Sequence, residues 1–567
     1  MEVFFFAPYF VCLIFIGFPM LHLHLCIGQY AGETPDAAFY RLMPITCGVG
    51  WAFVLAAIPA IMYHNFVLTW SLQYLWYSVL SMVISDRMPW EDRSSISELC
   101  VERIWTSAKK LRPQFSPTLQ IHIFDILSLT SYTQPAPTLP QRHIVLALTS
   151  AWLLIFVGIC KGTTWMSWAL RLTATIPYLM LFVLLIRGLS LPGASIGLSF
   201  LFSSASNSIL SPKIWSAAAE QVLFEVGVGA GAIISIAAYS KYRNNVYRDA
   251  ALLAIIMVLF SFLGLLSISS GKDISSIINH DPFYMIFTVI PSTTSLMRWG
   301  PLWMSILFAT VVFTTIDAEF IWIEMLASSV MNVLGSKDRR LNSRKFPYAT
   351  VMDFFVFHSM NPLISSVPTF ILSFLVLIAF TYLYGVDRFL KDVSSMLRIP
   401  MGNGSKWVHL RVQEKLLELF GPCGAFIRIS WVLICPCSLT ILMFTHAASY
   451  KRPLLFDRHV SLASEFFAWT LMYTPLTAAL VGAIVAIVKM RQSGKYIDPT
   501  SRGPTIRSSC QPCVDNYGWR NGRLKEWQET VSLDHLPSQP SFATSLASQT
   551  TLTLFRFTTS VQWLYDF

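Results

Sequence analysis

Charged residues are scarce in this sequence. Lysine, arginine, aspartate and glutamate make up 13% of its 567 residues, whereas a soluble domain carries about 25%. Hydrophobic residues make up 54%, and the mean hydropathy is +0.55. This composition excludes a string of soluble domains and a disordered chain, and 10 cysteines are too few for a disulfide-rich secreted module. What remains is a polytopic helical membrane protein.

Eleven apolar segments come close to the length of about 20 residues that a helix needs to cross a bilayer core. They are apolar throughout rather than at alternate positions, which excludes a transmembrane β-barrel. The segment 348–366 is the weakest, because Asp353, His358 and Pro362 are costly in lipid. The segments lie near residues 3–27, 50–84, 144–160, 172–189, 214–239, 250–270, 302–333, 348–366, 369–386, 425–447 and 461–490.

The distribution of basic residues predicts the orientation. Lysine and arginine are frequent in 337–345, in the loop after residue 239 and in 387–415, and these loops fall on one side if every segment spans. Short basic loops stay in the cytoplasm, so we expect a cytoplasmic C-terminus and Met1 outside. The net charge of +10 is then mostly a topology signal, and no soluble basic face for nucleic acid is visible.

Several different short motifs occur along the chain in a fixed order. They include Gly17-Phe18-Pro19, Gly28-Gln29-Tyr30, Ile176-Pro177-Tyr178, Tyr239-Ser240-Lys241-Tyr242 and Tyr384-Gly385. In this order and spacing the sequence resembles the sodium:neurotransmitter symporter family (solute carrier family 6). The resemblance implies an all-α fold of twelve helices, which is built from inverted repeats and contains broken helices. About eleven of the twelve are expected here, because the Asn-x-Trp-Arg-Phe-Pro signature of the family's first helix does not occur in this sequence.

The resemblance to this family also predicts the domain organisation. Residues 1–490 form the transporter membrane domain, with a large extracellular loop at 91–143 and a cytoplasmic loop at 387–424. Residues 491–567 form a cytoplasmic tail, rich in serine and threonine and expected to be disordered. The tail ends in Tyr565-Asp566-Phe567, a short pattern that resembles a ligand of PDZ domains. The resemblance places the protein in the plasma membrane.

Glycine is concentrated at one point inside an apolar segment. Gly227, Gly229 and Gly231 favour a break in the helix, because each glycine costs about 1 kcal/mol relative to alanine. A break in lipid is tolerated where the freed backbone faces a cavity or an ion; the alternative is a close contact between helices through small residues. The resemblance favours the break and makes Phe224 the aromatic lid over the substrate.

Three further residues are expected at the substrate site by resemblance. Tyr63 and His64 lie in the family's third helix, and His64 replaces a tyrosine that touches the substrate. Trp322 replaces a small residue of the eighth helix and would make the cavity smaller; Glu319 lies in its neighbourhood.

Asp317 lies between apolar neighbours in a membrane segment, where an uncompensated carboxylate is costly. By resemblance it belongs to the second sodium site, with the carbonyl of Thr314 as a further ligand, and oxygen ligands suit a hard cation. The alternative is a carboxylate that bonds to a neighbouring helix. Two family ligands are replaced, a serine by Ala318 and an asparagine by Met257.

Glu225 stands where the family has a serine or threonine shared by the first sodium ion and the chloride ion. Tyr9, Gln221 and Ser261 match the other side chains of the chloride position. A carboxylate there could replace chloride by supplying the same negative charge, which predicts transport without chloride. The alternatives are that Glu225 is protonated by desolvation or that it blocks the site.

The sequence therefore predicts a sodium-coupled symporter of an amino acid, a neurotransmitter amine or a related small solute. Sodium is the expected ion, chloride is uncertain, and no organic cofactor is expected. The alternative is a truncated or divergent member that no longer transports and acts as a membrane interaction protein. An enzyme is not expected, because no metal-ligand cluster or pair of nucleophile and base recurs at a suitable spacing.

Overall fold

The computed structural model describes residues 5–84, 142–191, 211–240, 244–255, 297–334, 367–397, 418–450 and 462–492, with residues 195, 286–287, 290–294, 359–360, 363, 452, 454–455 and 458–459. Within this part the chain is helical, apart from a short antiparallel ribbon of β1 (Leu454–Leu455) and β2 (Arg458–His459). Most of the predicted loop at 91–143, most of the predicted segment 348–366 and almost all of the predicted tail lie outside the described residues.

The helices are ordered along the chain as follows. They are α1 (Phe6–Cys12), η2 (Leu13–Gly17), α2 (Phe18–Ala31), α3 (Pro35–Leu42), η3 (Pro44–Thr46), α4 (Cys47–Ile84), α7 (Arg142–Ile159), α8 (Thr163–Leu189), α10 (Pro212–Val226), α11 (Ala232–Ala238), α15 (Ile290–Thr294), α16 (Gly300–Leu334), α18 (Val367–Ile378), η8 (Ala379–Leu383), α19 (Val386–Leu397), α21 (Ala425–Ile429), η10 (Ser430–Ile434), α22 (Cys435–Ser449) and α23 (Leu462–Gln492).

Seven helices of the described part are long and apolar enough to cross a membrane. They are Phe6–Ala31, Pro44–Ile84, Arg142–Ile159, Trp165–Leu189, Gly300–Val330, Glu418–Ser449 and Leu462–Val488. An eighth is the pair Val367–Leu383 and Val386–Leu397, which bends by 91°. Each of these corresponds to a predicted segment. The predicted segment 214–239 is two short helices, α10 and α11, and most of 250–270 lies outside the described residues.

Large apolar side chains are exposed along several of these helices. Leu153 of α7, Phe182 of α8, Phe444 of α22 and Leu480 of α23 are each more than half exposed. Exposed apolar surface of this kind is unstable in water and suits a lipid environment. The protein is thus an all-α, multi-pass membrane protein, as the composition predicts.

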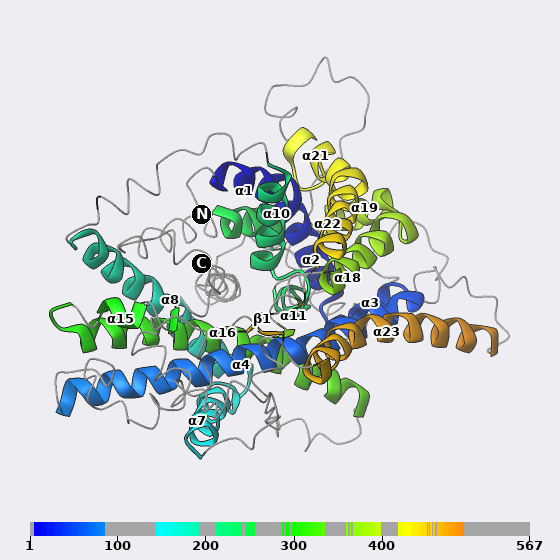
Figure 1. Ribbon diagram of the computed structural model, residues 1–567. Coiled ribbons are helices and arrows are strands. Elements are labelled where there is room, and N and C mark those ends of the chain that lie inside the picture. The colour runs from blue at the N-terminus through cyan, green and yellow to red at the C-terminus, as the bar shows by residue number, and fades with distance from the viewer. Residues whose placement is uncertain are drawn as a thin grey trace, which may run out of the picture.

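The long helices α4 and α16 lie side by side (Figure 1). Two ring contacts fix their register: His64 meets Trp322 with centroids 4.7 Å apart, and Tyr74 stacks on Phe308, also at 4.7 Å. Residue numbers therefore rise along α4 as they fall along α16, so the two helices are antiparallel.

Small residues bring other helices into close contact. A Cβ on Gly28 of α2 would lie 2.2 Å from the carbonyl oxygen of Ile234 in α11, and a Cβ on Gly17 would lie 2.5 Å from Val222 of α10. The first span therefore packs tightly against both halves of the broken helix. Glycine at such points allows backbones to approach closely inside a membrane.

The glycine cluster does break the helix. Helix α10 ends at Val226 and α11 begins at Ala232, and Gly227 and Gly231 adopt φ angles of 67° and 68°. These left-handed angles are unfavourable for residues that carry a Cβ. A Cβ on Gly231 would also lie 2.8 Å from the Cβ of Phe53, so both the backbone angle and this close contact require glycine at this position.

Candidate functional site

A cavity of about 740 Å³, part of which opens to solvent, lies beside the break. Helices α4, α10, α16, α18 and α23 contribute to its wall, together with the segment between α10 and α11. Its described lining residues are Ala56, Pro59, Ala60, Tyr63, His64, Leu223, Phe224, Gly227, Gly229, Ala230, Trp322, Pro368, Thr369, Leu372, Met472, Pro475 and Leu476.

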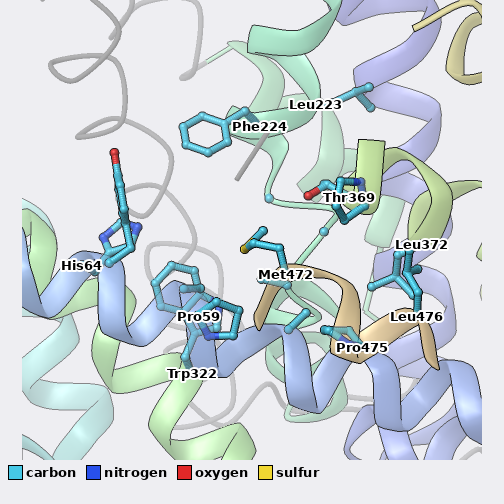
Figure 2. Close-up of a pocket in the computed structure, with 17 residues that line it drawn as sticks. Pro59, His64, Leu223, Phe224, Trp322, Thr369, Leu372, Met472, Pro475 and Leu476 are labelled. Carbon is cyan, nitrogen blue, oxygen red and sulfur yellow. The ribbon is translucent and has the colours of Figure 1, made fainter. Parts of the chain in front are cut away.

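All four residues predicted to bind substrate line this one cavity. Figure 2 shows Phe224 on the side of the broken helix, with His64 and Trp322 on the side of α4 and α16. Tyr63 belongs to the same wall as His64. Residues far apart in the sequence are thus brought together, and their binding role stays a prediction.

The His64–Trp322 contact shapes one wall of the cavity. Their rings meet edge to face at an interplanar angle of 63°, a favourable geometry for aromatic pairs. The imidazole is 1% exposed and the indole 7%. Trp322 therefore packs against α4 at the cavity wall, and its effect on the size of the cavity stays a prediction.

Prolines and a threonine also line the cavity. Pro59 lies inside α4 and Pro475 inside α23, and a proline inside a helix leaves a carbonyl one turn earlier without its usual donor. Thr369 approaches the break closely, because a Cβ on Gly229 would lie 2.3 Å from its methyl carbon. The sequence did not predict that these residues line the cavity. A proline within a long apolar run was the signal that could have indicated it.

Asp317 is completely buried on α16. Its Oδ1 accepts a hydrogen bond from the hydroxyl of Thr173 in α8, and its Oδ2 has no hydrogen-bond partner among the described residues. The hydroxyl of Thr314 bonds to carbonyls of its own helix, at 2.8 Å from that of Thr310, and Ala318 is 1% exposed. Thr173 was not singled out from the sequence, although a hydroxyl in an apolar helix was a usable signal.

Glu225 is the centre of a buried polar cluster at the end of α10. Tyr9 donates its hydroxyl proton to Oε2, and the amide Nε2 of Gln221 donates to Oε1 over 3.0 Å. The carboxylate is 2% exposed. Three of the four residues predicted for the chloride position thus meet, whereas Ser261, like Met257, lies outside the described residues.

A second carboxylate of α16 has a different environment. Glu319 is completely buried, and neither of its oxygens has a hydrogen-bond partner in the described part of the chain. Among the same residues, no group of three or more histidine, cysteine, aspartate or glutamate side chains could hold a metal ion.

The sequence matches the sodium:neurotransmitter symporter family over residues 3–492, which confirms the resemblance drawn from the motifs. The sodium-dependent transporter snf-12 of Caenorhabditis elegans is 36% identical over 607 aligned positions, which cover 93% of this chain and 59% of that protein. The sodium- and chloride-dependent GABA transporter 2 of Rattus norvegicus is 30% identical over 368 positions, which cover 62% of this chain and 60% of that protein. The chain thus spans about three fifths of the length of these relatives.

Proposed function

Because the chain belongs to the sodium:neurotransmitter symporter family, a family of transporters rather than enzymes, we propose that it is a sodium-coupled secondary transporter. It carries an amino acid, a neurotransmitter amine or a related small solute across the plasma membrane by alternating access. The observation that supports this most is the cavity beside the broken helix, which Tyr63, His64, Phe224 and Trp322 line together.

The cavity lies between two groups of helices, which touch where Gly231 approaches Phe53 of α4. The first span packs against α10 and α11 through Gly17 and Gly28. On the other side, α4 and α16 hold each other through His64 and Trp322. A tilt of one group against the other opens the cavity toward either face of the membrane, which is the motion that alternating access needs.

Asp317 is our candidate for the sodium ligand. Its Oδ2 has no hydrogen-bond partner among the described residues and is buried, so a cation beside it would offset the cost of burying the carboxylate. Thr173 orients the other oxygen. Sodium would then link α16 to its neighbours while the carbonyl of Thr314 supplies a further oxygen.

Glu225 is our candidate for a substitute for chloride. Tyr9 and Gln221 point their donors at its carboxylate, as they would point them at a bound anion. A fixed negative charge there makes chloride unnecessary for transport. Replacing sodium chloride by sodium gluconate should leave the uptake rate unchanged, and Glu225→Ser should restore a requirement for chloride.

The test of the whole proposal is uptake into proteoliposomes that contain the full chain. Radiolabelled amino acids and amines are added with an inward sodium gradient or with choline in place of sodium. We expect one compound to accumulate only with sodium. No sodium-dependent accumulation of any compound would contradict the proposal.

A second candidate is a family member that no longer transports and acts as a membrane interaction protein. Trp322 against His64 favours it, because the indole occupies space at the wall of the cavity, and Ala318 offers no side-chain ligand for sodium. The C-terminal residues 565–567, outside the described residues, are the proposed ligand of a PDZ-type partner. If the chain binds such a domain but fails the uptake assay, this second function is the correct one.

A further inference from the structure

We propose that Glu319 and Asn65 form a polar recess between α16 and α4 that receives the ammonium group of the transported solute. This inference rests on the proposed function, because it assumes that the central cavity binds a solute. It assigns a role to a carboxylate that neither the predicted sodium site nor the predicted chloride position uses.

The first observation is the isolation of Glu319. Helix α16 also buries Asp317 and Glu324, but Asp317 accepts a hydrogen bond from Thr173, and Glu324 accepts from the hydroxyls of Tyr239 and Ser328 at 3.1 and 3.2 Å. Glu319 has no such donor in the described part of the chain. A buried carboxylate without a partner is unfavourable, so Glu319 needs a positively charged or proton-donating group.

The second observation is Asn65 on the facing helix. Its side chain is 1% exposed, and neither its oxygen nor its nitrogen has a hydrogen-bond partner among the described residues. The antiparallel register of α4 and α16 places the two residues at the same level, because the contact of His64 with Trp322 lies beside both of them. Buried polar groups without a partner need an explanation, and one polar ligand between the two helices would satisfy both.

The recess adjoins the cavity through Trp322 and His64, which both line it. Trp322 follows Glu319 by three residues, so the two side chains are neighbours on α16. The indole nitrogen of Trp322 also has no hydrogen-bond partner in the described part of the chain. Trp322 therefore borders both the recess and the cavity.

The chemistry of the cavity selects a cation. Its described lining contains no lysine, arginine, aspartate or glutamate, while Tyr63, Phe224 and Trp322 offer aromatic rings. Aromatic faces attract organic cations, and an ammonium group has three donors for the oxygens of Glu319 and Asn65. A solute whose only charge is negative would meet the like charge of Glu319 and be rejected.

The test uses the purified full chain in lipid nanodiscs at constant sodium chloride. The probes are 2-phenylethylammonium and its neutral analogue 2-phenylethanol, and affinity is measured by calorimetry. We expect the ammonium to bind at least about tenfold more tightly than the alcohol, since hydrogen bonds to charged groups are the strong ones. Glu319→Gln should abolish this preference, while Glu319→Asp should retain part of it.

Glu324→Gln is the matched control, because it removes another buried carboxylate of α16 whose hydrogen bonds are already satisfied. It should keep the preference for the ammonium. Asn65→Leu gives a second variant if Glu319→Gln fails to fold, and it should reduce the preference as well.

Three results would overturn the inference: equal affinities of the wild type for the two probes, an unchanged preference in Glu319→Gln, or an equal loss in Glu324→Gln. If Glu319→Gln changes only the stabilisation by sodium, the recess holds an inorganic cation and the ammonium assignment is wrong. Failure of the proposed function looks different, because then the wild type binds neither probe.

Discussion

The broken helix and the continuous helix α16 each bury a glutamate, and they treat it in opposite ways. Glu225, at the end of α10, accepts hydrogen bonds from Tyr9 and Gln221. Glu319, in the middle of α16, accepts none from the described residues. The comparison teaches that burial alone does not define a site: one carboxylate belongs to a network of described side chains, and the other has no hydrogen-bond partner among them.

The largest effect on stability is expected at the break between α10 and α11, which the continuous helix α16 does not have. Gly231→Ala has two costs. Its left-handed φ angle costs a residue with a Cβ about 1–2 kcal/mol. The added Cβ would lie 2.8 Å from the Cβ of Phe53, and overpacking of this kind costs about 1–3 kcal/mol. Gly231→Ala should therefore lower the thermal unfolding midpoint clearly. Gly227→Ala is the control, since it has the same φ sign but nothing within 4 Å of the added atom; an equal shift for both variants would contradict the role of Phe53.

Isosteric replacement should lower the stability at one of the two glutamates and not at the other. In Glu225→Gln, the hydrogen bonds from Tyr9 and Gln221 lose their charged acceptor. Hydrogen bonds to charged groups contribute about 1.5–3 kcal/mol and neutral ones about 0.5–1.5 kcal/mol, so the stability should fall. In Glu319→Gln no described hydrogen bond is lost, so the stability should stay the same or rise. Thermal unfolding of both variants in the same nanodiscs checks this, and a clear loss of stability in Glu319→Gln would remove the distinction between the two regions.

A smaller effect is expected at Thr173, the single described donor to Asp317. Thr173→Val keeps the shape of the side chain but removes a hydrogen bond to a carboxylate, worth about 1.5–3 kcal/mol, and should weaken sodium binding by about tenfold or more. Thr175→Val is the control, because that exposed hydroxyl bonds to its own helix at Arg171. A sodium titration followed by tryptophan fluorescence measures both; equal affinities would separate Thr173 from the sodium site.

The smallest effect is expected where a carboxylate lies near the surface. Glu220 on α10 pairs with His446 of α22 at 2.8 Å, and both side chains are partly exposed. Ion pairs of this kind contribute about 0–1 kcal/mol, so Glu220→Gln should change the unfolding midpoint very little. A loss as large as that of Glu225→Gln would show that exposure does not separate the two classes of carboxylate.

The sequence predicted much of this structure because its strongest signals are local. Apolar runs of bilayer length predicted the spans, and three glycines in 227–231 predicted the break between α10 and α11. The four residues expected at the substrate came together because the motifs fixed their helices. Residue types in fixed order are enough for predictions of this kind.

Partners across helices could not be predicted in the same way. The hydroxyl of Thr173 reaches Asp317 from a residue 144 positions away, and the isolation of Glu319 depends on which side chains surround it. Both depend on the register and rotation of packed helices, which the pattern of apolar residues leaves undetermined. For the same reason Thr369 and Met472 were not expected at the cavity.

The central claim is that a buried carboxylate of α16 couples sodium to the cavity, and a sodium titration of the purified chain tests it most directly. Thermal stability is measured in increasing sodium against choline for the wild type, for Asp317→Asn and for the control Asp392→Asn, whose carboxylate accepts a hydrogen bond from Tyr384 over 2.6 Å on α19. We predict stabilisation by sodium in the wild type and in Asp392→Asn, and its loss in Asp317→Asn. An unchanged response to sodium in Asp317→Asn would contradict the account.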